Sequence, residues 1–319
     1  MDQNEMLAKI EFEDVPQCPV CGNPDEMVDM ITDVELNRPS QSWRLCLNCG
    51  HTFVSPRPTE KFLAEFYTSG YRQMTHGLKE PESKDKIPVN SVNEERSRAM
   101  RVATTVMQLR TKVSNHLDVG SSTGALCAGV VDLLRPAHTW GVEPNDAWRG
   151  FSEGAFANRR PEILNYEDDV KFGATLSKVP KTIKFELVTI IHTLEHLLNP
   201  REVLEECKRR MKPNGLLVVE VPNRYGGMAN PLLWPHLHSF TEQTLDRLLT
   251  GVGFFPILHD SYGNFPPFFQ PSAAILVVAT LKEPAISLAD VLQRYSQYRA
   301  VVGNVQQRMA QARPNYDIG

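Results

Sequence analysis

The stretch LDVGSSTGAL, residues 117–126, decides the fold class of this 319-residue chain. A short apolar strand ends at Asp118, and a turn bounded by Gly120 and Gly124 leads from it into a helix. Glycine permits unusual backbone angles and lets the backbone approach a ligand closely. Ser122 stands where a nucleotide-binding loop often has its middle glycine. The stretch therefore predicts a strand, a ligand-binding turn and a helix in succession.

The same alternation of helix and strand continues from about residue 94. The stretches expected to be helices are 94–110, 124–134, 199–211 and 241–254. The stretches expected to be strands are 116–120, 138–144, 186–194, 215–223, 255–260 and 272–281, with an uncertain further strand near 165–172. Such alternation predicts an α/β fold with a doubly wound, mostly parallel sheet. In that architecture ligands bind beyond the carboxyl ends of the strands.

The acidic residues around the turn indicate the kind of ligand. The spacing Gly-x-x-x-Gly differs from the GxGxxG loop that cradles a pyrophosphate, and Asp118 precedes the first glycine by two residues. A carboxylate at that point would repel a pyrophosphate but favour a cationic ligand or its amine. Glu143, in GVEPN, follows the next strand about twenty residues on, where an acid can accept hydrogen bonds from both hydroxyls of a ribose.

Composition places the chain among ordinary globular proteins. Hydrophobic residues make up 41% and charged residues 23%, and the formal net charge is −4. The sequence has no stretch of the roughly 20 apolar residues that span a membrane, and its N-terminus lacks the shape of a signal peptide. These features favour a cytoplasmic enzyme that does not enter a membrane.

Four of the six cysteines form two pairs with metal-ligand spacing. Cys18 and Cys21 lie in CPVCG, and Cys46 and Cys49 lie in CLNCG. In a reducing cytosol such pairs indicate a metal site and not disulfides. Four thiolates suit a tetrahedral Zn²⁺ with no open position, so the ion would be structural. The alternative is four thiols without a metal.

The charge of this segment argues against nucleic acid as a partner. Residues 1–60 carry eleven acidic and four basic side chains, which leaves about +3 for the rest of the chain. Nucleic-acid affinity depends mainly on neutralisation of phosphates by Lys and Arg. The two cysteine pairs are typical of a zinc ribbon. We therefore expect this ribbon to brace the enzyme, cover its pocket or contact a partner.

The pattern divides the chain into four parts. They are a zinc ribbon (1–60), a helix followed by a linker or flap (61–93), the alternating α/β domain (94–281) and a C-terminal helix (282–319). The last part has an apolar stripe at helical spacing, from Leu288 to Met309. This stripe is expected to pack on the body or on a second subunit, so a homodimer is one of the expectations.

Five segments in the same order resemble class I S-adenosylmethionine-dependent methyltransferases. They are LDVGSSTG, GVEPN, FELVTIIHTLEHLLNP, MKPNGLLVVEVPN and HLHSFTEQTLDRLLTGVGF. The combination of HTLEHLLNP, EVPN and HLHSFT with a zinc ribbon is similar to the small-molecule branch, in particular to C-methyltransferases of nucleotide-linked deoxysugars. The resemblance implies a seven-stranded Rossmann-like sheet. The usual loop of the family is DxGxGxG, from which Ser122 departs, and its sugar-modifying members carry a further C-terminal domain that this sequence does not show.

The resemblance also implies a cofactor site. Asp118 and the loop of Gly120, Ser122 and Gly124 would meet the methionine part of S-adenosylmethionine, and Glu143 its ribose. His192, just beyond the fourth strand, would line the same pocket. The adenine side is poorly matched. Asp168 or Asp169 is the candidate there, and the alternative is that both are surface carboxylates.

Catalytic candidates come from HTLEH, which faces the methyl group in this fold. If the acceptor is a hydroxyl or a carbon beside a carbonyl, a base must remove a proton, and a histidine oriented by a carboxylate suits that task. His196 is the candidate base, Glu195 its partner and His192 a further candidate. The rate is then expected to rise with pH through a pKa near roughly 6 to 7. The alternative is that this segment only caps the next helix and lines the cofactor pocket.

Four more residues are candidates for the acceptor side. His236 and His238 of WPHLHSF follow the fifth strand, and Tyr67 and Tyr71 of FYTSGY resemble the aromatic lid of ribbon-bearing relatives. Each of the four has a structural alternative in a loop, the core or the surface.

The sequence thus predicts a methyltransferase that acts on a small molecule, such as a nucleotide-linked sugar or a natural-product intermediate, at carbon or oxygen. The alternatives are a zinc-ribbon RNA methyltransferase and a binding protein that kept the fold. The intact set of Asp118, Gly120, Gly124 and Glu143 argues against the last alternative.

Overall fold

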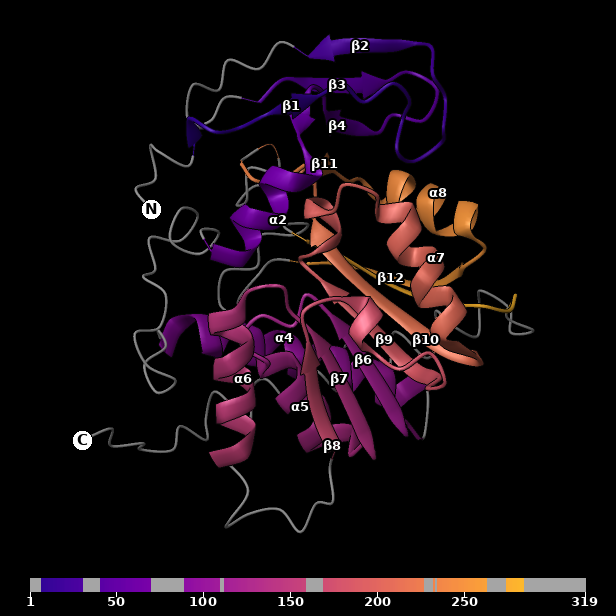
Figure 1. The fold of residues 1–319 in the computed structure, drawn as a ribbon. Coiled ribbons are helices and arrows are strands. Elements are labelled where there is room, and N and C mark those ends of the chain that lie inside the picture. Colours follow the sequence, from indigo (N-terminus) through magenta and orange to yellow (C-terminus); the bar gives the residue numbers. More distant parts are fainter. Residues whose placement is uncertain are drawn as a thin grey trace.

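A seven-stranded sheet forms the centre of the computed structural model (Figure 1), which describes residues 7–30, 41–69, 89–109, 112–158, 169–226, 232, 234–262 and 274–283. The strands of this sheet are β6 (Asn115–Val119), β7 (His138–Val142), β8 (Asp169–Gly173), β9 (Phe185–Ile191), β10 (Met211–Pro222), β12 (Phe255–Tyr262) and β13 (Ala274–Thr280). Their order is β12-β13-β10-β9-β6-β7-β8, and β13 runs antiparallel to both of its neighbours. The expected seven-stranded, mostly parallel, doubly wound α/β sheet is confirmed.

Helices flank this sheet. They are α4 (Val89–Leu109), α5 (Ala125–Leu134), α6 (Asp146–Asn158), α7 (Pro200–Arg210) and α8 (Glu242–Val252), with 3₁₀ turns at Leu176–Lys178 and Leu194–His196. The ends of α8 follow directly from its sequence, because Thr241 and Thr244 form a reciprocal capping box and Gly253 closes the last turn in a left-handed conformation. None of the helices in the described ranges is long and apolar enough to cross a membrane.

Helices α4 and α6 and strand β10 are among the elements that differ from the sequence expectation. Helix α4 begins at Val89 and not at 94, since no glycine or proline interrupts the chain between Val89 and Leu109. Strand β10 begins at Met211 and not at 215, because Met211 already pairs with Phe185 before an irregularity that ends at Leu216. Helix α6, which begins at Asp146, was not expected from the sequence.

A smaller antiparallel sheet lies at one end of the molecule, at the top of Figure 1. Its strands are β2 (Met27–Met30), β3 (Trp43–Cys46), β4 (Thr52–Val54) and β11 (His238–Ser239), and β1 (Phe12–Glu13) pairs separately with β5 (Arg57–Pro58). Strand β11 belongs to the segment that follows β10, yet it pairs with β4 of the cysteine-bearing module. The two parts of the chain therefore share one sheet.

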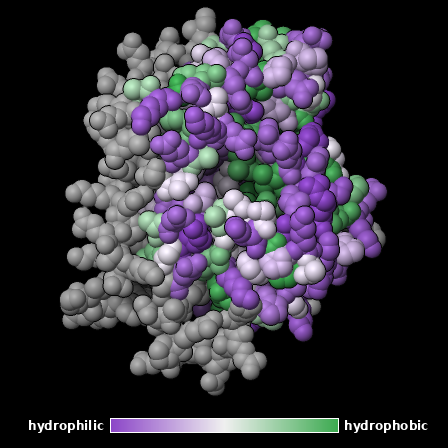
Figure 2. Space-filling view, in the orientation of Figure 1, coloured by the Kyte–Doolittle hydropathy of each residue, from purple (hydrophilic) through white to green (hydrophobic). Residues whose placement is uncertain are grey.

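This shared strand places the N-terminal module over the carboxyl ends of the large sheet. The backbone N–H of Leu237 donates to the carbonyl of Glu195, in the turn after β9, and the N–H of Val54 donates to the carbonyl of Leu237. Helix α2 (Glu60–Ser69) adds Phe62 and Phe66 to an apolar cluster with Trp43, and Trp234 packs against it. Figure 2 shows the surface of the molecule in the orientation of Figure 1. The described part of this surface is largely hydrophilic, with apolar residues near its centre, where the surface is hollowed.

Candidate active site

The glycine loop forms the predicted turn between β6 and α5. Gly120 has a φ of +83°, and a Cβ on it would lie 2.0 Å from Thr193 Oγ1, so no side chain fits there. Gly124 is the left-handed N-cap of α5. Ser122 also adopts a positive φ, 48°, which costs a non-glycine residue on the order of 1 kcal/mol. Its N–H donates to Glu143 Oε2 and its carbonyl accepts from Ser152 Oγ, and these bonds hold the conformation.

Asp118 lies beneath this loop and is 1% exposed. Its Oδ1 accepts a hydrogen bond from Thr189 Oγ1 at 2.7 Å, and the Cys127 thiol donates to its Oδ2 at 3.6 Å. The carboxylate thus ties β6 to β9 and to the first turn of α5. Because β6 and β9 lie at the point where the strand order reverses, Asp118 is at the switch point expected for a ligand.

Glu143 follows β7 and is half-buried. Its two oxygens accept hydrogen bonds from the N–H groups of Ser122 and Asn145, each at 2.9 Å. A carboxylate oxygen accepts more than one hydrogen bond, so these contacts orient the group and still permit it to bind two hydroxyls. The geometry therefore fits the ribose-binding acid that the sequence indicates.

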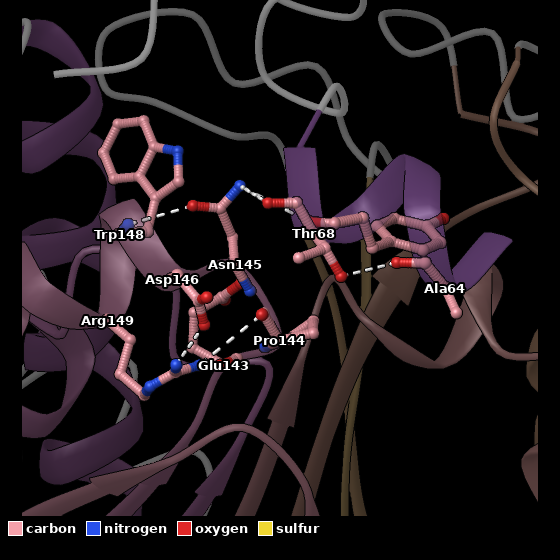
Figure 3. A network of polar contacts seen from close by, with 9 residues as sticks. Ala64, Thr68, Glu143, Pro144, Asn145, Asp146, Trp148 and Arg149 are labelled. Atoms are coloured by element: carbon pink, nitrogen blue, oxygen red, sulfur yellow. Dashed lines mark hydrogen bonds and ion pairs between the residues drawn. The ribbon is translucent and has the colours of Figure 1, made fainter. Parts of the chain in front are cut away.

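Asn145 connects this acid to the N-terminal part of the chain (Figure 3). Its Oδ1 accepts from the N–H of Trp148 at 3.0 Å and caps α6, while its Nδ2 donates to the carbonyl of Thr68 at 2.9 Å near the end of α2. One buried amide thus serves the start of one helix and the end of another. The sequence analysis did not single out Asn145, although its place beside Glu143 and before α6 is a cap signal.

A network of ionisable side chains joins the residue after β9 to Glu220 of β10 and to α4. His192 Nε2 is 3.0 Å from Glu220 Oε1, and Glu220 is also paired with Arg98 at 3.6 Å and Arg101 at 3.4 Å. Burial opposes ionisation of Glu220, but Arg101 and His192 together keep its pKa low. Burial and Arg98 lower the pKa of His192, but Glu195 and Glu220 outweigh them and raise it. His192 also has a φ of +48°, a strained conformation often kept at functional sites. Glu220 was missed because nothing in EVPN shows what it faces.

In the turn after β9, Glu195 and His196 lie beside two residues of other segments, Tyr67 and His236. The rings of His196 and His236 lie edge to face with centroids 4.8 Å apart, and the ring of Tyr67 lies 6.0 Å from that of His196. His196 Nδ1 donates to the carbonyl of Pro235 at 3.4 Å, which leaves the lone pair on Nε2. These contacts gather Tyr67, His196 and His236 beside Glu195.

The protonation of His196 differs from what the sequence predicted. Burial lowers its pKa to about 3, although Glu195 opposes this shift. Burial opposes ionisation of Glu195, but the facing His192 outweighs it and lowers the pKa of Glu195 to about 2. His196 is therefore a neutral imidazole at physiological pH, and the expected pKa near 6 to 7 does not describe it.

His238 contributes to a different contact. Its Nε2 donates to the carbonyl of Leu197 at 2.8 Å, and its Nδ1 lies 3.2 Å from Nε2 of His51. Both imidazoles are buried, and burial lowers their pKa values, to about 4 for His238. Both ring nitrogens of His238 are thus in contact with the protein, and the residue joins the two sheets, while its role toward a substrate stays a prediction.

The four cysteines converge as expected. Cys18 Sγ lies 3.6 Å from Cys49 Sγ, and Cys21 Sγ lies 3.7 Å from Cys46 Sγ. A tetrahedral zinc with bonds of about 2.3 Å requires sulfur atoms about 3.8 Å apart, so the set fits a zinc ion. The N–H groups of Gly22 and Gly50 donate to the carbonyls of Cys18 and Cys46 in the same way, which gives the two pairs one geometry.

Three predictions fall outside the described residues. They concern Asp168 as the adenine-side acid, Tyr71 as part of the lid, and the C-terminal helix, of which only Lys282 and Glu283 are described. These remain predictions.

The glycine loop, the acid after β7 and the order of the seven strands define a class I S-adenosylmethionine-dependent methyltransferase. In agreement, a family described as a methyltransferase domain matches residues 92–258. The chain belongs to this family, and its fold is that of a class I S-adenosylmethionine-dependent methyltransferase.

Curated relatives match parts of the chain. The ubiquinone biosynthesis O-methyltransferase of Bradyrhizobium diazoefficiens is 29% identical over 108 residues, which are 34% of this chain and 40% of that protein. The protein of the same name from Glaesserella parasuis is 37% identical over 46 residues, 14% of this chain and 20% of that protein. The chain thus spans less than half of each of these two relatives.

Among solved structures, magnesium protoporphyrin IX methyltransferase from Synechocystis PCC 6803 superimposes with a TM-score of 0.50 and 12% identity. The superposition covers 70% of this chain and all of that one. At this identity the likeness concerns the fold alone.

Proposed function

We propose that this enzyme transfers a methyl group from S-adenosylmethionine to an oxygen or an acidic carbon of a small molecule, such as a nucleotide-linked sugar or a natural-product intermediate. The observation that carries the proposal is the position of His196, whose Nδ1–H donates to the Pro235 carbonyl so that Nε2 carries the lone pair beside the carboxyl group of Glu195. These groups follow β9, the strand next to the glycine loop, so they face the same edge of the sheet as the cofactor residues.

The proposed cofactor residues keep the roles that the sequence suggested. Glu143 would accept the ribose hydroxyls, the backbone of Gly120 to Gly124 would border the methionine part, and the carboxyl group of Asp118 beneath the loop would favour a cationic ligand. S-adenosylmethionine supplies an electrophilic methyl group on a sulfonium. Alignment of the acceptor with that methyl group is a large part of the catalysis of such a displacement.

His196 is the proposed general base. The acceptor atom bonds to the methyl carbon as the carbon–sulfur bond breaks, the sulfur keeps the bonding electron pair, and the acceptor proton moves to Nε2 of His196. Glu195 Oε1 lies 3.8 Å from that nitrogen and would stabilise the resulting imidazolium. Tyr67 and His236 would form the walls around the acceptor.

The class of the acceptor is tested by the transfer of a labelled methyl group to the fractions of a cell extract. The enzyme, incubated with S-adenosylmethionine labelled in its methyl group and a cell extract, should place the label in the dialysable small-molecule fraction. Label found in RNA or protein would contradict the proposal. The acidic N-terminal module, with eleven acidic and four basic side chains in residues 1–60, supports the small-molecule outcome.

The base is tested with a His196→Gln variant. We expect kcat to fall by about 10² to 10⁴, with the affinity for S-adenosylhomocysteine unchanged. Because burial lowers the pKa of His196 to about 3, the wild-type rate should show no limb from this residue between about pH 5 and 8. Full activity of the variant on a true acceptor would show that His196 is only a pocket wall.

A further inference from the structure

Three potential metal ligands converge from two segments beyond the carboxyl ends of the large sheet. Glu195 and His196 lie in the turn after β9, and His236 lies in the segment that leads to β11. One ligand atom from each of the three lies within 4.8 Å of the others. The hydrogen bond from Leu237 N to the Glu195 carbonyl, at 2.8 Å, holds the two segments together at this point.

The carboxylate of Glu195 lacks the hydrogen bonds that its burial requires. Glu195 is 1% exposed, and neither side-chain oxygen accepts a hydrogen bond from any residue within the described ranges. Two histidine nitrogens lie within ion-pair distance of Oε1, His192 Nδ1 at 3.5 Å and His196 Nε2 at 3.8 Å. A carboxyl group whose two oxygens are buried without a hydrogen bond is costly unless a cation or a donor from outside the chain reaches it.

The arrangement of charges around Glu195 favours a cation. Arg98 and Arg101 are directed to Glu220 and not to Glu195. His196 turns its Nδ1–H to Pro235, so the lone pair on Nε2 is on the side of the carboxylate. An imidazole lone pair and a carboxylate repel each other unless a positive charge lies between them. His192 Nδ1 lies 3.5 Å from Glu195 Oε1, and its other ring nitrogen lies 3.0 Å from Glu220 Oε1, so His192 is shared between two carboxylates.

From this geometry we infer that Glu195, His196 and His236 bind a divalent transition-metal ion, separate from the ion of the four cysteines. Imidazole and carboxylate ligands suit Zn²⁺ and similar ions, whereas Mg²⁺ and Ca²⁺ prefer oxygen ligands alone. Three protein ligands leave a position open, as in catalytic and not structural zinc sites.

The role of this ion rests on the proposed function. An acceptor hydroxyl in the open coordination position would lose its proton to water more readily, because a bound cation stabilises the oxyanion. The acceptor would then be a molecule with a hydroxyl or enol oxygen. With the ion in place, Nε2 of His196 is a ligand and cannot take a proton. The ligand role and the base role are therefore alternatives for one nitrogen, and the metal content of the protein decides between them.

The test is to replace the metal of the full-length protein with Co²⁺ and to measure both metal content and absorption. Cobalt in the four-cysteine site gives strong thiolate charge-transfer bands, whereas cobalt in the second site adds only weak visible bands. We expect two ions per chain in the wild type. His236→Ala should lose the second ion and its weak bands while it keeps the thiolate bands.

Two further variants make the result specific. Glu195→Gln, which changes little in shape, should also lose the second ion, and the control His259→Gln, on a histidine paired with Asp246 at the surface, should keep both. One ion per chain in the wild type, or a second ion retained in both site variants, would overturn the inference. Calorimetric titration with S-adenosylhomocysteine separates the two proposals, because loss of cofactor binding would refute the proposed function whatever the metal content.

Discussion

Asn145 provides a sharp test of how the N-terminal part of the chain is joined to the cofactor site. Its side chain caps α6 through Oδ1 and holds the end of α2 through Nδ2 (Figure 3). Asn145→Asp keeps the cap, because aspartate is as good an N-cap as asparagine. The substitution replaces the Nδ2 donor with an oxygen. In the wild type Nδ2 donates to the carbonyl of Thr68 at 2.9 Å, so in the variant two oxygens would face each other at about that distance.

The expected cost follows from this geometry. The lost hydrogen bond contributes about 1 kcal/mol, and the unsatisfied carbonyl facing a buried oxygen adds at least about as much. Asn145 is 4% exposed, so water cannot replace the lost donor. We therefore expect a destabilisation of about 2 kcal/mol, which corresponds to a fall in Tm of roughly 4 °C or more. Asn145→Ser is the matched control, since serine caps α6, is too short to reach α2 and brings no charge.

The measurement is thermal unfolding of both variants with and without S-adenosylhomocysteine. The aspartate variant should be less stable than the serine variant by about 1 kcal/mol, although both residues cap helices equally well. If Asn145 serves only as a helix cap, both variants will be about as stable as the wild type, because asparagine, aspartate and serine cap helices about equally well. That result would refute the proposed link between α2 and the cofactor site.

Three other outcomes are expected. Glu143→Ala should weaken binding of S-adenosylmethionine at least tenfold, about 1.4 kcal/mol, in calorimetry, and an unchanged Kd would remove Glu143 from the site. Cys46→Ser should lose the zinc of the four-cysteine cluster and destabilise the N-terminal module with little change in cofactor affinity, whereas a wild-type protein without zinc would contradict the ribbon. Stability should decline on acidification, because burial lowers the pKa of His116 to about 3. The unfolded chain takes up its proton below about pH 6.5 and the folded chain does not, so stability is complete above that pH and falls towards pH 3. His116→Gln should make acid unfolding less steep, and an equally steep profile would show that His116 is not a cause.

Several features of this protein are determined by short stretches of its sequence. The strand and turn around Asp118, the capping box of Thr241 and the two CxxC pairs each depend on residues within a few positions of one another. Local backbone preferences and hydrophobic periodicity therefore suffice to predict them. The alternation of elements then gives the doubly wound sheet, because parallel strands need helical connections.

The pocket itself depends on contacts between distant segments. Glu195 and His236 meet because β11 leaves the large sheet and pairs with β4, which places residues 234–239 over the turn after β9. The same pairing buries His238 against His51, so this histidine joins the two sheets. No local signal shows which of several histidines will be buried against a neighbour, because hydrogen-bond partners such as these lie 41 and 187 residues away in the chain.

The protonation of the site was likewise decided by tertiary structure. The side chain of His196 alone suggests a pKa near 6.5, but burial lowers the pKa to about 3, although Glu195 opposes this shift. Sequence identifies which ionisable groups are present near a strand end. Their charge depends on the solvent and the neighbours that each group loses or gains on folding, and only the packed structure determines those.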